Sequence, residues 1–307
     1  MKVLITGATG LIGTALVKKA ISEGIKIHYL TTKKSKINSL KGAVSFHWDP
    51  SLNIIDNNCF KGVQSIIHLA GSSISKPWTS NYKRIILSSR IDSTRLLISS
   101  IKKLKPHCSI KNIVSASAIG IYPSQFGEIQ TEKTHVSPNS FMEQVVISWE
   151  KELEGFNKLN IKVSKLRIGL VLSFSGGILK TLKIPTLFGL GTAFGNGKQG
   201  QSWIHIDDLV EIFIKSTKET WEGVYNAAAP NPVSQKYFLK ALAKALNRPY
   251  FLPPIPKFLL KLLIGEMSSL ILDSHWVSSQ RLIEKGFNFS FKDIDTAMQE
   301  IIDKSKS

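Results

Sequence analysis

Residues 2–24 read KVLITGATGLIGTALVKKAISEG, and this stretch determines the fold predicted for the first half of the chain. Its first five residues are largely aliphatic or β-branched, which predicts a short strand that ends at a glycine turn. Residues 11–24 then carry apolar side chains at near-helical spacing, which predicts a helix with Gly24 at its C-terminal cap. The apolar positions are Leu11, Ile12, Leu16, Val17 and Ile21.

Three glycines, Gly7, Gly10 and Gly13, lie between this predicted strand and helix. In a βαβ unit such glycines permit a tight turn, a close approach of backbone to a pyrophosphate, and close packing of helix on strand. The start of the helix adds unpaired N–H groups and partial positive charge. A purely structural turn is the alternative, but the context favours a dinucleotide site. The expected contact residues are Gly7, Thr9, Gly10, Leu11, Ile12 and Gly13.

The end of the next predicted strand, KIHYLT at 26–31, bears on which dinucleotide is bound. NAD sites usually carry Asp or Glu there to hold the ribose 2′-hydroxyl. This chain instead has Thr31, Thr32, Lys33 and Lys34, with no carboxylate, and these side chains could hold a 2′-phosphate. In a lysine-rich chain the same lysines could be ordinary surface charges. The missing carboxylate is the stronger argument, so we expect NADP in preference to NAD, with Thr32 and Lys33 among its contacts.

Composition limits the other classes of function. The chain has 307 residues, 43% of them hydrophobic and 20% charged, so it can form a large core. Forty Lys and Arg against 22 Asp and Glu give a net charge of +18. Nucleic-acid readers favour clustered Arg with aromatic platforms. Here Arg is scarce and Lys is spread along the chain, so we expect a solvated basic surface and no nucleic-acid partner.

Two cysteines, Cys59 and Cys108, exclude a disulfide framework, and no Cys/His spacing predicts a metal site. A reducing, cytoplasmic location is therefore the default expectation. The N-terminus lacks the apolar region of a signal peptide. The most apolar late stretch, residues 251–273, contains three prolines as well as Lys257, Lys261 and Glu266, so it fails the test for a lipid-spanning helix. We expect a buried helix there and no membrane partner.

Strands and helices alternate through the first half of the chain. Residues 44–48, 64–70, 112–118 and 162–172 predict strands, and residues 82–105 and 141–156 predict helices. This alternation predicts an α/β fold, a doubly wound parallel sheet with helices on both faces. Beyond residue 170 a glycine-rich irregular segment precedes a strand and helix at 203–219, and the last eighty residues look mostly helical with proline-rich joints. We expect a dinucleotide-binding domain at 1–168 with 202–226, and a smaller, mostly helical substrate domain at 169–201 with 227–307, the site lying in the cleft between them.

An ordered series of short motifs extends this pattern over nearly the whole chain. It includes His68-Leu-Ala-Gly71, Ser89-Arg90-Ile91, Ser115-Ala-Ser117, Trp149-Glu150, Leu166-Arg167-Ile-Gly169, Trp203-Ile-His205-Ile-Asp207-Asp208, Asn226-Ala-Ala-Ala-Pro230 and Gly265-Glu266. The series resembles the extended short-chain dehydrogenase/reductases, and within them an atypical NAD(P)-dependent epimerase family that ends in a small C-terminal domain of unknown function. The resemblance implies further cofactor contacts at Leu69, Ala70, Gly71, Arg90 and Ser115.

Members of that superfamily use Ser, Tyr and Lys for catalysis, and Ser117 matches the Ser position. The Tyr-x-x-x-Lys motif is absent, because counting back from Trp149 places Met142 and Val146 in its two positions. Neither side chain can move a proton. Tyr122, which follows the Ser strand, is the candidate replacement, although a packed loop aromatic is an equal alternative.

Other candidates are less specific. Glu132 could be a solvated loop residue, Arg90 could form a surface salt bridge, and His205 is expected to hold structure through Asp207 or Asp208. The expected substrate contacts are Trp203, Gln201 and Arg167, with packing the more common role for a Trp. The function predicted is an NADP-binding oxidoreductase or epimerase acting on a small polar substrate, a nucleotide sugar being one candidate. The alternative is a non-catalytic NADP-binding regulator, for which a role in cell division is one label within the family.

Overall fold

The computed structural model describes residues 1–105 and 109–304, which form two compact units. The first unit comprises Met1–Ala118, Ser140–Leu166 and Val210–Val224. The second comprises Ile119–Asn139, Arg167–Leu209 and the described part of Tyr225–Ser307. Cys108 lies outside the described residues, whereas Cys59 is buried. The domain bounds expected from the sequence stay a prediction.

The first unit is built on a parallel sheet, as the sequence predicts. Its strands are β1 (Lys2–Thr6), β2 (Lys26–Thr31), β3 (Ala43–Asp49), β4 (Ile54–Ile55), β5 (Ser65–His68) and β6 (Asn112–Ala118). β8 (Lys162–Ile168) and β13 (Gly223–Ala227) complete the order β13-β8-β6-β5-β1-β2-β3-β4. The strand pairs β6–β5, β5–β1, β1–β2 and β2–β3 are parallel, and β4 pairs with β3 in the antiparallel direction. The side chains of β1 and β5 are buried on both faces of the sheet, as expected for central strands of a parallel sheet.

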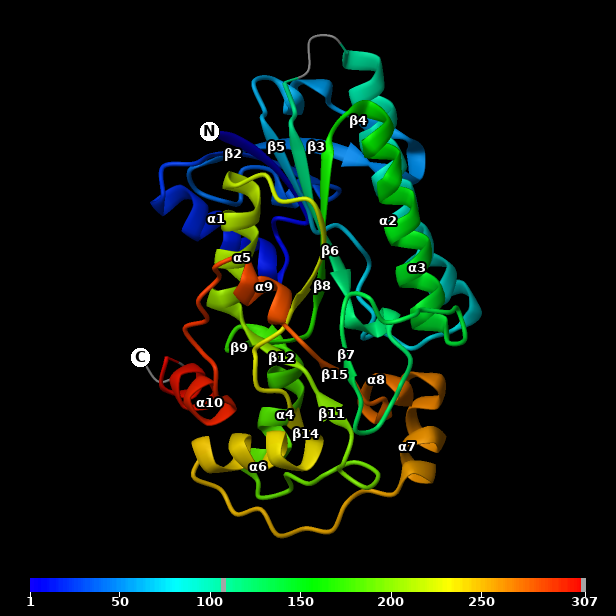
Figure 1. Cartoon of the computed structure of the whole chain (residues 1–307), viewed down its shortest axis with the longest axis vertical. Coiled ribbons are helices and arrows are strands. Elements are labelled where there is room, and N and C mark those ends of the chain that lie inside the picture. The colour runs from blue at the N-terminus through cyan, green and yellow to red at the C-terminus, as the bar shows by residue number, and fades with distance from the viewer. Residues whose placement is uncertain (106–108, 305–307) are drawn as a thin grey trace. The chain divides into compact units, whose positions relative to one another are not determined.

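Helices cover both faces of this sheet. Figure 1 shows α2 (Ser80–Leu104) and α3 (Phe141–Leu153) on one side, with α1 (Leu11–Ser22) and α5 (Ile206–Lys218) on the other. Local sequence sets where they start. The Thr79 hydroxyl accepts a hydrogen bond from the Tyr82 N–H at the start of α2. Ser140 and Glu143 form a reciprocal capping box at the start of α3. The predicted α/β doubly wound fold is therefore confirmed.

The second unit combines three small sheets with helices. Its strands pair as β10-β9-β12, β11-β14 and β15-β7. They are β7 (Ile129–Gln130), β9 (Leu170–Ser173), β10 (Gly176–Gly177), β11 (Gly200–Gln201), β12 (Trp203–His205), β14 (Val233–Ser234) and β15 (Trp276–Val277). The helices are α4 (Ile178–Leu187), α6 (Gln235–Ala245), α7 (Lys257–Ile264), α8 (Ser269–Leu272), α9 (Gln280–Glu284) and α10 (Ile294–Asp303). The core lies where α6 and α10 pack on Leu172, Leu179 and Trp203.

Three expectations from the sequence are wrong in detail. Residues 162–172 form two strands, not one, because the chain turns at Gly169, whose added Cβ would lie 2.4 Å from the Ser202 carbonyl oxygen. The irregular segment after residue 170 contains a helix, α4. The apolar helix expected to be buried within 251–273 is α7, and of its eight residues only Leu260 is buried. Within the described ranges, no helix combines the length and apolar character needed to cross a membrane.

A buried polar cluster ties the ends of β1 and β5 together. The Thr6 hydroxyl lies 2.7 Å from His68 Nδ1 and accepts hydrogen bonds of 3.1 Å from the N–H groups of Leu69 and Ala70. On its other side His68 Nε2 lies 3.2 Å from the Thr94 hydroxyl on α2. Burial of His68 lowers its pKa from 6.5 to about 3, so the ring stays neutral in the folded protein at physiological pH.

We expect this histidine to make stability depend on pH. Because its folded pKa lies below its unfolded pKa, protons bind the unfolded chain preferentially. The stabilisation is present above pH 6.5 and is lost as pH falls toward 3. Between pH 7 and pH 5 the free energy of unfolding should fall by about 2 kcal/mol through His68 alone. Urea denaturation of wild type and His68→Gln across this range measures the effect.

The variant should be less stable at pH 7 but should lose this part of the pH slope. Substitution of the exposed His135 by Gln is the matched control and should leave the slope unchanged. Buried His275, whose pKa burial lowers to about 4, adds a slope of the same sign in every variant. An unchanged slope in His68→Gln would contradict the assignment.

Candidate functional site

The glycine turn after β1 allows the backbone to approach the backbone after β5 closely. Gly7 has a φ of +67°, and a Cβ placed on it would lie 2.8 Å from both the carbonyl carbon and oxygen of Leu69. A Cβ on Gly13 would lie 2.3 Å from the Gly7 carbonyl oxygen. Side chains are therefore excluded at both positions. Since the N-cap residue of α1 is Gly10, no side chain from that position occupies the N–H groups of the first turn.

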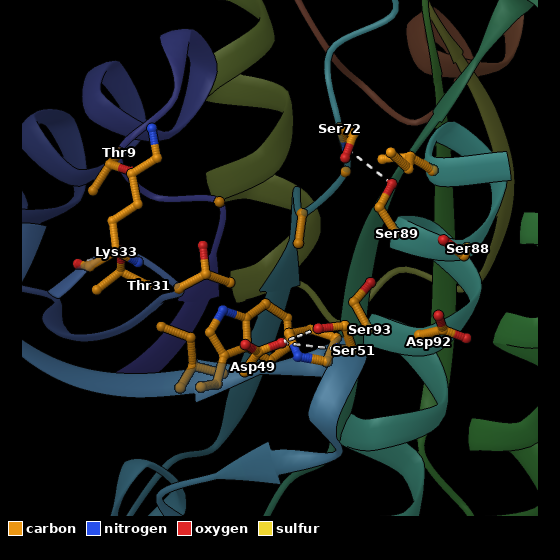
Figure 2. Close-up of a pocket in the computed structure, with 18 of the residues that line it drawn as sticks. Thr9, Thr31, Lys33, Asp49, Ser51, Ser72, Ser88, Ser89, Asp92 and Ser93 are labelled. Carbon is orange, nitrogen blue, oxygen red and sulfur yellow. Dashed lines mark hydrogen bonds between the residues drawn. The ribbon is translucent and has the colours of Figure 1, made fainter. Parts of the chain in front are cut away.

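A pocket of about 500 Å³ opens beside this turn, a volume typical of sites for small molecules and cofactors. The carboxyl ends of β1, β2, β3 and β5 and the first half of α2 supply its walls. In Figure 2, Thr9, Thr31 and Lys33 lie on one side of the pocket and the serines of α2 lie on the other. The predicted cofactor residues that line it are Gly7, Thr9, Thr32, Lys33, Ala70 and Gly71.

Cationic and hydroxyl side chains follow β2, as predicted. Thr31, Thr32, Lys33 and Lys36 all line the pocket. The Thr31 hydroxyl accepts a 3.2 Å hydrogen bond from the Lys33 N–H, which fixes the turn after the strand. This corner of the pocket therefore carries the ammonium groups of Lys33 and Lys36 and the hydroxyl of Thr32. It is suited to an anionic group of the ligand.

Acidic and hydroxyl side chains line a separate part of the same pocket, and sequence reasoning missed them. Asp49 is the last residue of β3, and its Oδ1 accepts hydrogen bonds from the Ser51 hydroxyl at 2.6 Å and the Ser51 N–H at 3.0 Å. These bonds lower the pKa of Asp49, so its carboxylate is ionised. The signal was available, because Asp49 directly follows a predicted strand and the carboxyl ends of parallel strands share one edge. The other missed lining residues include Trp48, Ser88, Ser89, Asp92 and Ser93.

Several predicted cofactor residues are not among the lining residues of this pocket. Gly10, Leu11, Ile12 and Gly13 belong to the turn and the first turn of α1, and Leu69 contacts the turn through its backbone. The Ser115 hydroxyl is fully buried and donates to the Ala116 carbonyl.

Arg90 projects from α2 toward the backbone after β5. A Cβ on Gly71 would lie 3.1 Å from its guanidinium carbon, which itself lies 5.2 Å from the centre of the Trp149 ring. Its Nη1 donates to the carbonyls of Ile86 and Ser72 at 2.8 and 3.3 Å. Burial lowers the pKa of Arg90 to about 10, so the group remains charged at neutral pH. A partly buried cation held by carbonyls and an aromatic face thus lies next to Gly71.

Ser117, the expected catalytic serine, forms a short hydrogen bond within the first unit. Its hydroxyl donates to Glu150 Oε1 on α3 over 2.6 Å, and both side chains are buried. The bond fixes the hydroxyl proton toward the carboxylate, which leaves the oxygen lone pairs as acceptors. Val146, one turn earlier on α3, is buried and Met142 is partly buried, so the two positions of the missing motif carry apolar side chains.

Tyr122 belongs to the second unit, in a buried polar network. Its hydroxyl donates to Asn226 Oδ1 at 2.7 Å and accepts from Arg167 Nη1 at 2.9 Å. Burial raises the pKa of Tyr122, although Arg167 opposes the shift. Glu132 joins the network by accepting from the Asn226 N–H at 2.8 Å. The structure thus brings Tyr122, Arg167 and Glu132 together, whereas Ser117 lies in the other unit.

The remaining predicted residues of the second unit are packed. Trp203 is fully buried in the core, and its indole N–H donates to the Asn231 carbonyl at 3.1 Å. Gln201 is nearly buried on β11.

Hydrogen bonds to neighbouring residues occupy both ring nitrogens of His205. Its Nδ1 accepts from the Asp207 N–H, so Nε2 carries the proton and donates to Glu300 at 3.0 Å. His205, Asp207 and Glu300 have the donor types of a metal site, but Lys304 forms ion pairs with both carboxylates.

The fold, the glycine turn and the pocket define the class of protein: a dinucleotide-binding α/β protein. The model of the NAD dependent epimerase/dehydratase family matches residues 3–228, and that of a domain of unknown function, DUF1731, matches residues 255–301. The chain belongs to the NAD dependent epimerase/dehydratase family.

Relatives and solved structures agree with this membership. An epimerase family protein of Staphylococcus haemolyticus is 34% identical over 304 residues, covering 98% of each chain. The crystal structure of the human epimerase family protein SDR39U1 with NADPH has a TM-score of 0.85 at 25% identity, covering 99% of each chain. UDP-glucose 4-epimerase of Thermotoga maritima, solved with UDP-glucose, shares the fold with a TM-score of 0.76 at 18% identity and full coverage of both chains.

Two glycines of similar conformation test how much the close approach at the turn matters. Gly24 has a φ of +72° and no atom within 4 Å of an added Cβ, whereas Gly7 faces the Leu69 backbone. Gly24→Ala should cost about 1 kcal/mol of unfolding free energy, the strain of a left-handed residue. Gly7→Ala should cost about 1–3 kcal/mol more, because backbone must shift. Chemical denaturation of both variants measures the difference, and equal losses would contradict the role given to this contact.

Proposed function

We propose that the pocket binds NADP, with the 2′-phosphate at the corner formed by Thr32, Lys33 and Lys36. The observation that carries this proposal is the pairing of a glycine turn, in which a side chain at Gly7 is excluded, with two lysines and no carboxylate at the end of β2. The start of α1 would hold a diphosphate through its N–H groups, because the N-cap residue Gly10 has no side chain to occupy them. The human relative was solved with NADPH, which supports the proposal.

The opposite polarity of the pocket walls suits the rest of the nucleotide. Lys33 and Lys36 supply positive charge beyond β2, while Asp49 supplies an ionised carboxylate beyond β3. A carboxylate held by Ser51 can accept a hydrogen bond from an exocyclic amino group such as that of adenine. It would also disfavour a phosphate on its own side of the pocket. We therefore assign the base to the Asp49 side and the 2′-phosphate to the Lys33 side.

We expect the lysines to set the coenzyme preference. Lys33→Ala and Lys36→Ala should each weaken NADPH binding by about tenfold and change NADH binding little, because each removes one charge facing the 2′-phosphate. Lys34→Ala is the matched control, since Lys34 lies in the same turn but does not line the pocket. Titrations followed by nicotinamide fluorescence measure both constants. Equal affinities of wild type for NADPH and NADH would refute the assignment.

We propose further that the protein is an oxidoreductase or epimerase of the extended short-chain dehydrogenase type, acting in the cytoplasm on a small polar substrate, with a nucleotide sugar as one candidate. Bound NADP would supply hydride transfer at the nicotinamide. Ser117, with its proton directed to Glu150, would accept a hydrogen bond from a substrate hydroxyl. Residues 169–201 and 227–307 would supply the substrate side, with Arg167 and Gln201 as candidate contacts. Trp203, being fully buried, would support them through packing.

One observation favours a second candidate function, a non-catalytic regulator that binds NADP and for which cell division is one possible setting. The apolar Met142 and Val146 occupy the positions of the usual proton donor and its lysine. The Tyr122 hydroxyl already donates a hydrogen bond to Asn226 and accepts one from Arg167. It is therefore not free to act as the proton donor in their place. A regulator needs only the pocket and a conformational response to its occupant.

Isotope exchange separates the two functions. With NADPH labelled at nicotinamide C4 and NADP⁺ present to accept hydride from the sugar alcohol, wild type should exchange label with a substrate in pools of nucleotide sugars, and Ser117→Ala should reduce exchange by about 100-fold. NADPH affinity should not change in this variant. Ser164→Ala, which removes a buried strand serine bonded to Ser216, is the control and should retain exchange. Tight NADPH binding without exchange in any pool would favour the regulator.

A further inference from the structure

The helix α7 presents an apolar surface that the chain itself leaves uncovered. Phe258, Leu262 and Leu263 are 67%, 80% and 76% exposed, and Leu259 is 37% exposed. Phe258 and Leu262 are four residues apart, as are Leu259 and Leu263, so the four side chains form one continuous outer face on two helical turns. Contiguous apolar patches of this kind mark interaction sites in folded proteins, whereas single exposed leucines do not.

The packing of α7 leaves this face free of the rest of its unit. Leu260 is the buried residue of the helix, and α7 packs against the following 3₁₀ segment, Gly265–Ser268. Figure 1 shows α7 at the margin of the second unit, with α8 beside it and no helix of that unit drawn over its outer side. The apolar face of α7 is therefore exposed within its unit and accessible to a partner surface.

Positive charge flanks the apolar face. Lys257 and Lys261, four residues apart, lie along one edge of α7, and the helix contains no acidic residue. The Lys257 ammonium lies 5.9 Å from the ring centre of Phe126, which is itself half exposed. The whole chain carries a net charge of +18. Two copies meeting at this face would bring like charges together, so charge complementarity favours an anionic occupant.

We propose that α7 docks the protein onto the surface of a bilayer that contains anionic phospholipid. Phe258, Leu259, Leu262 and Leu263 would enter the boundary between headgroups and acyl chains. Lys257 and Lys261 would keep their methylene stems at the apolar edge and their ammonium groups at the lipid phosphates. Lying on a bilayer differs from crossing it, so the finding that no described helix can span a membrane is compatible. The inference departs from the expectation of no membrane partner and does not depend on the nucleotide pocket.

Vesicle co-sedimentation of the full chain tests the proposal. Wild type should bind vesicles of phosphatidylcholine with phosphatidylglycerol at least about tenfold more tightly than phosphatidylcholine alone, and raised salt should weaken the binding. The triple variant Phe258→Ser, Leu262→Ser, Leu263→Ser keeps every charge and should lose about tenfold or more of the affinity. Lys257→Gln with Lys261→Gln should lose the preference for the anionic vesicles.

Controls keep the test specific. Ile283→Ser with Lys240→Gln removes one exposed apolar side chain and one exposed lysine from other helices of the unit, and should bind as wild type does. Circular dichroism and NADPH titration check that each variant folds. No binding by wild type, or equal binding by the triple serine variant, overturns the proposal. It is also overturned if light scattering gives a dimer for wild type and a monomer for the triple variant, or if binding requires an added acidic protein.

Discussion

The contact of the Gly7 turn with the backbone after β5 is the constraint on which the rest of the first unit depends. Its geometry excludes a side chain at Gly7 and at Gly13. The Thr6 hydroxyl stabilises this contact by accepting hydrogen bonds from the N–H groups of Leu69 and Ala70. His68 links β5 to β1 and to α2 through its hydrogen bonds with the hydroxyls of Thr6 and Thr94. The groups that form these hydrogen bonds are the Thr6 hydroxyl and the neutral His68 ring. Changes of pH near neutrality therefore do not alter their charge.

That constraint also organises the polarity of the pocket. Parallel strands end at one edge, so the residues after β1, β2, β3 and β5 meet there although they are far apart in the chain. Along this edge, the lysines after β2 are separate from the ionised aspartate at the end of β3. The two sides of the pocket therefore carry opposite charge. By contrast, the residues expected at the catalytic positions depart from the usual scheme of the superfamily. A serine paired with a glutamate remains, and apolar residues replace the tyrosine and lysine.

The glycine turn, the alternation of strands and helices and the lysines after β2 could be predicted because each is a local pattern with a steric or electrostatic cause. Asp49 and the serines of α2 were missed because they come from separate segments that only the sheet brings together. Tyr122 illustrates the same limit. Its type suggested proton transfer, but its hydroxyl is shared between Asn226 and Arg167, which lie 104 and 45 residues away. Helix α7 was predicted to be buried because composition alone does not distinguish an apolar core helix from an apolar surface helix.

The sequence by itself determined the class of fold, the place of the dinucleotide turn and the absence of the usual acid/base pair. These follow from residue types whose physical limits hold in any context: glycine has no Cβ, and methionine and valine carry no exchangeable proton. Only the tertiary structure decided which side chains share the pocket, which hydroxyls are already bonded and which apolar helix stays exposed. Those properties depend on distances between segments remote in the chain, and packing fixes such distances.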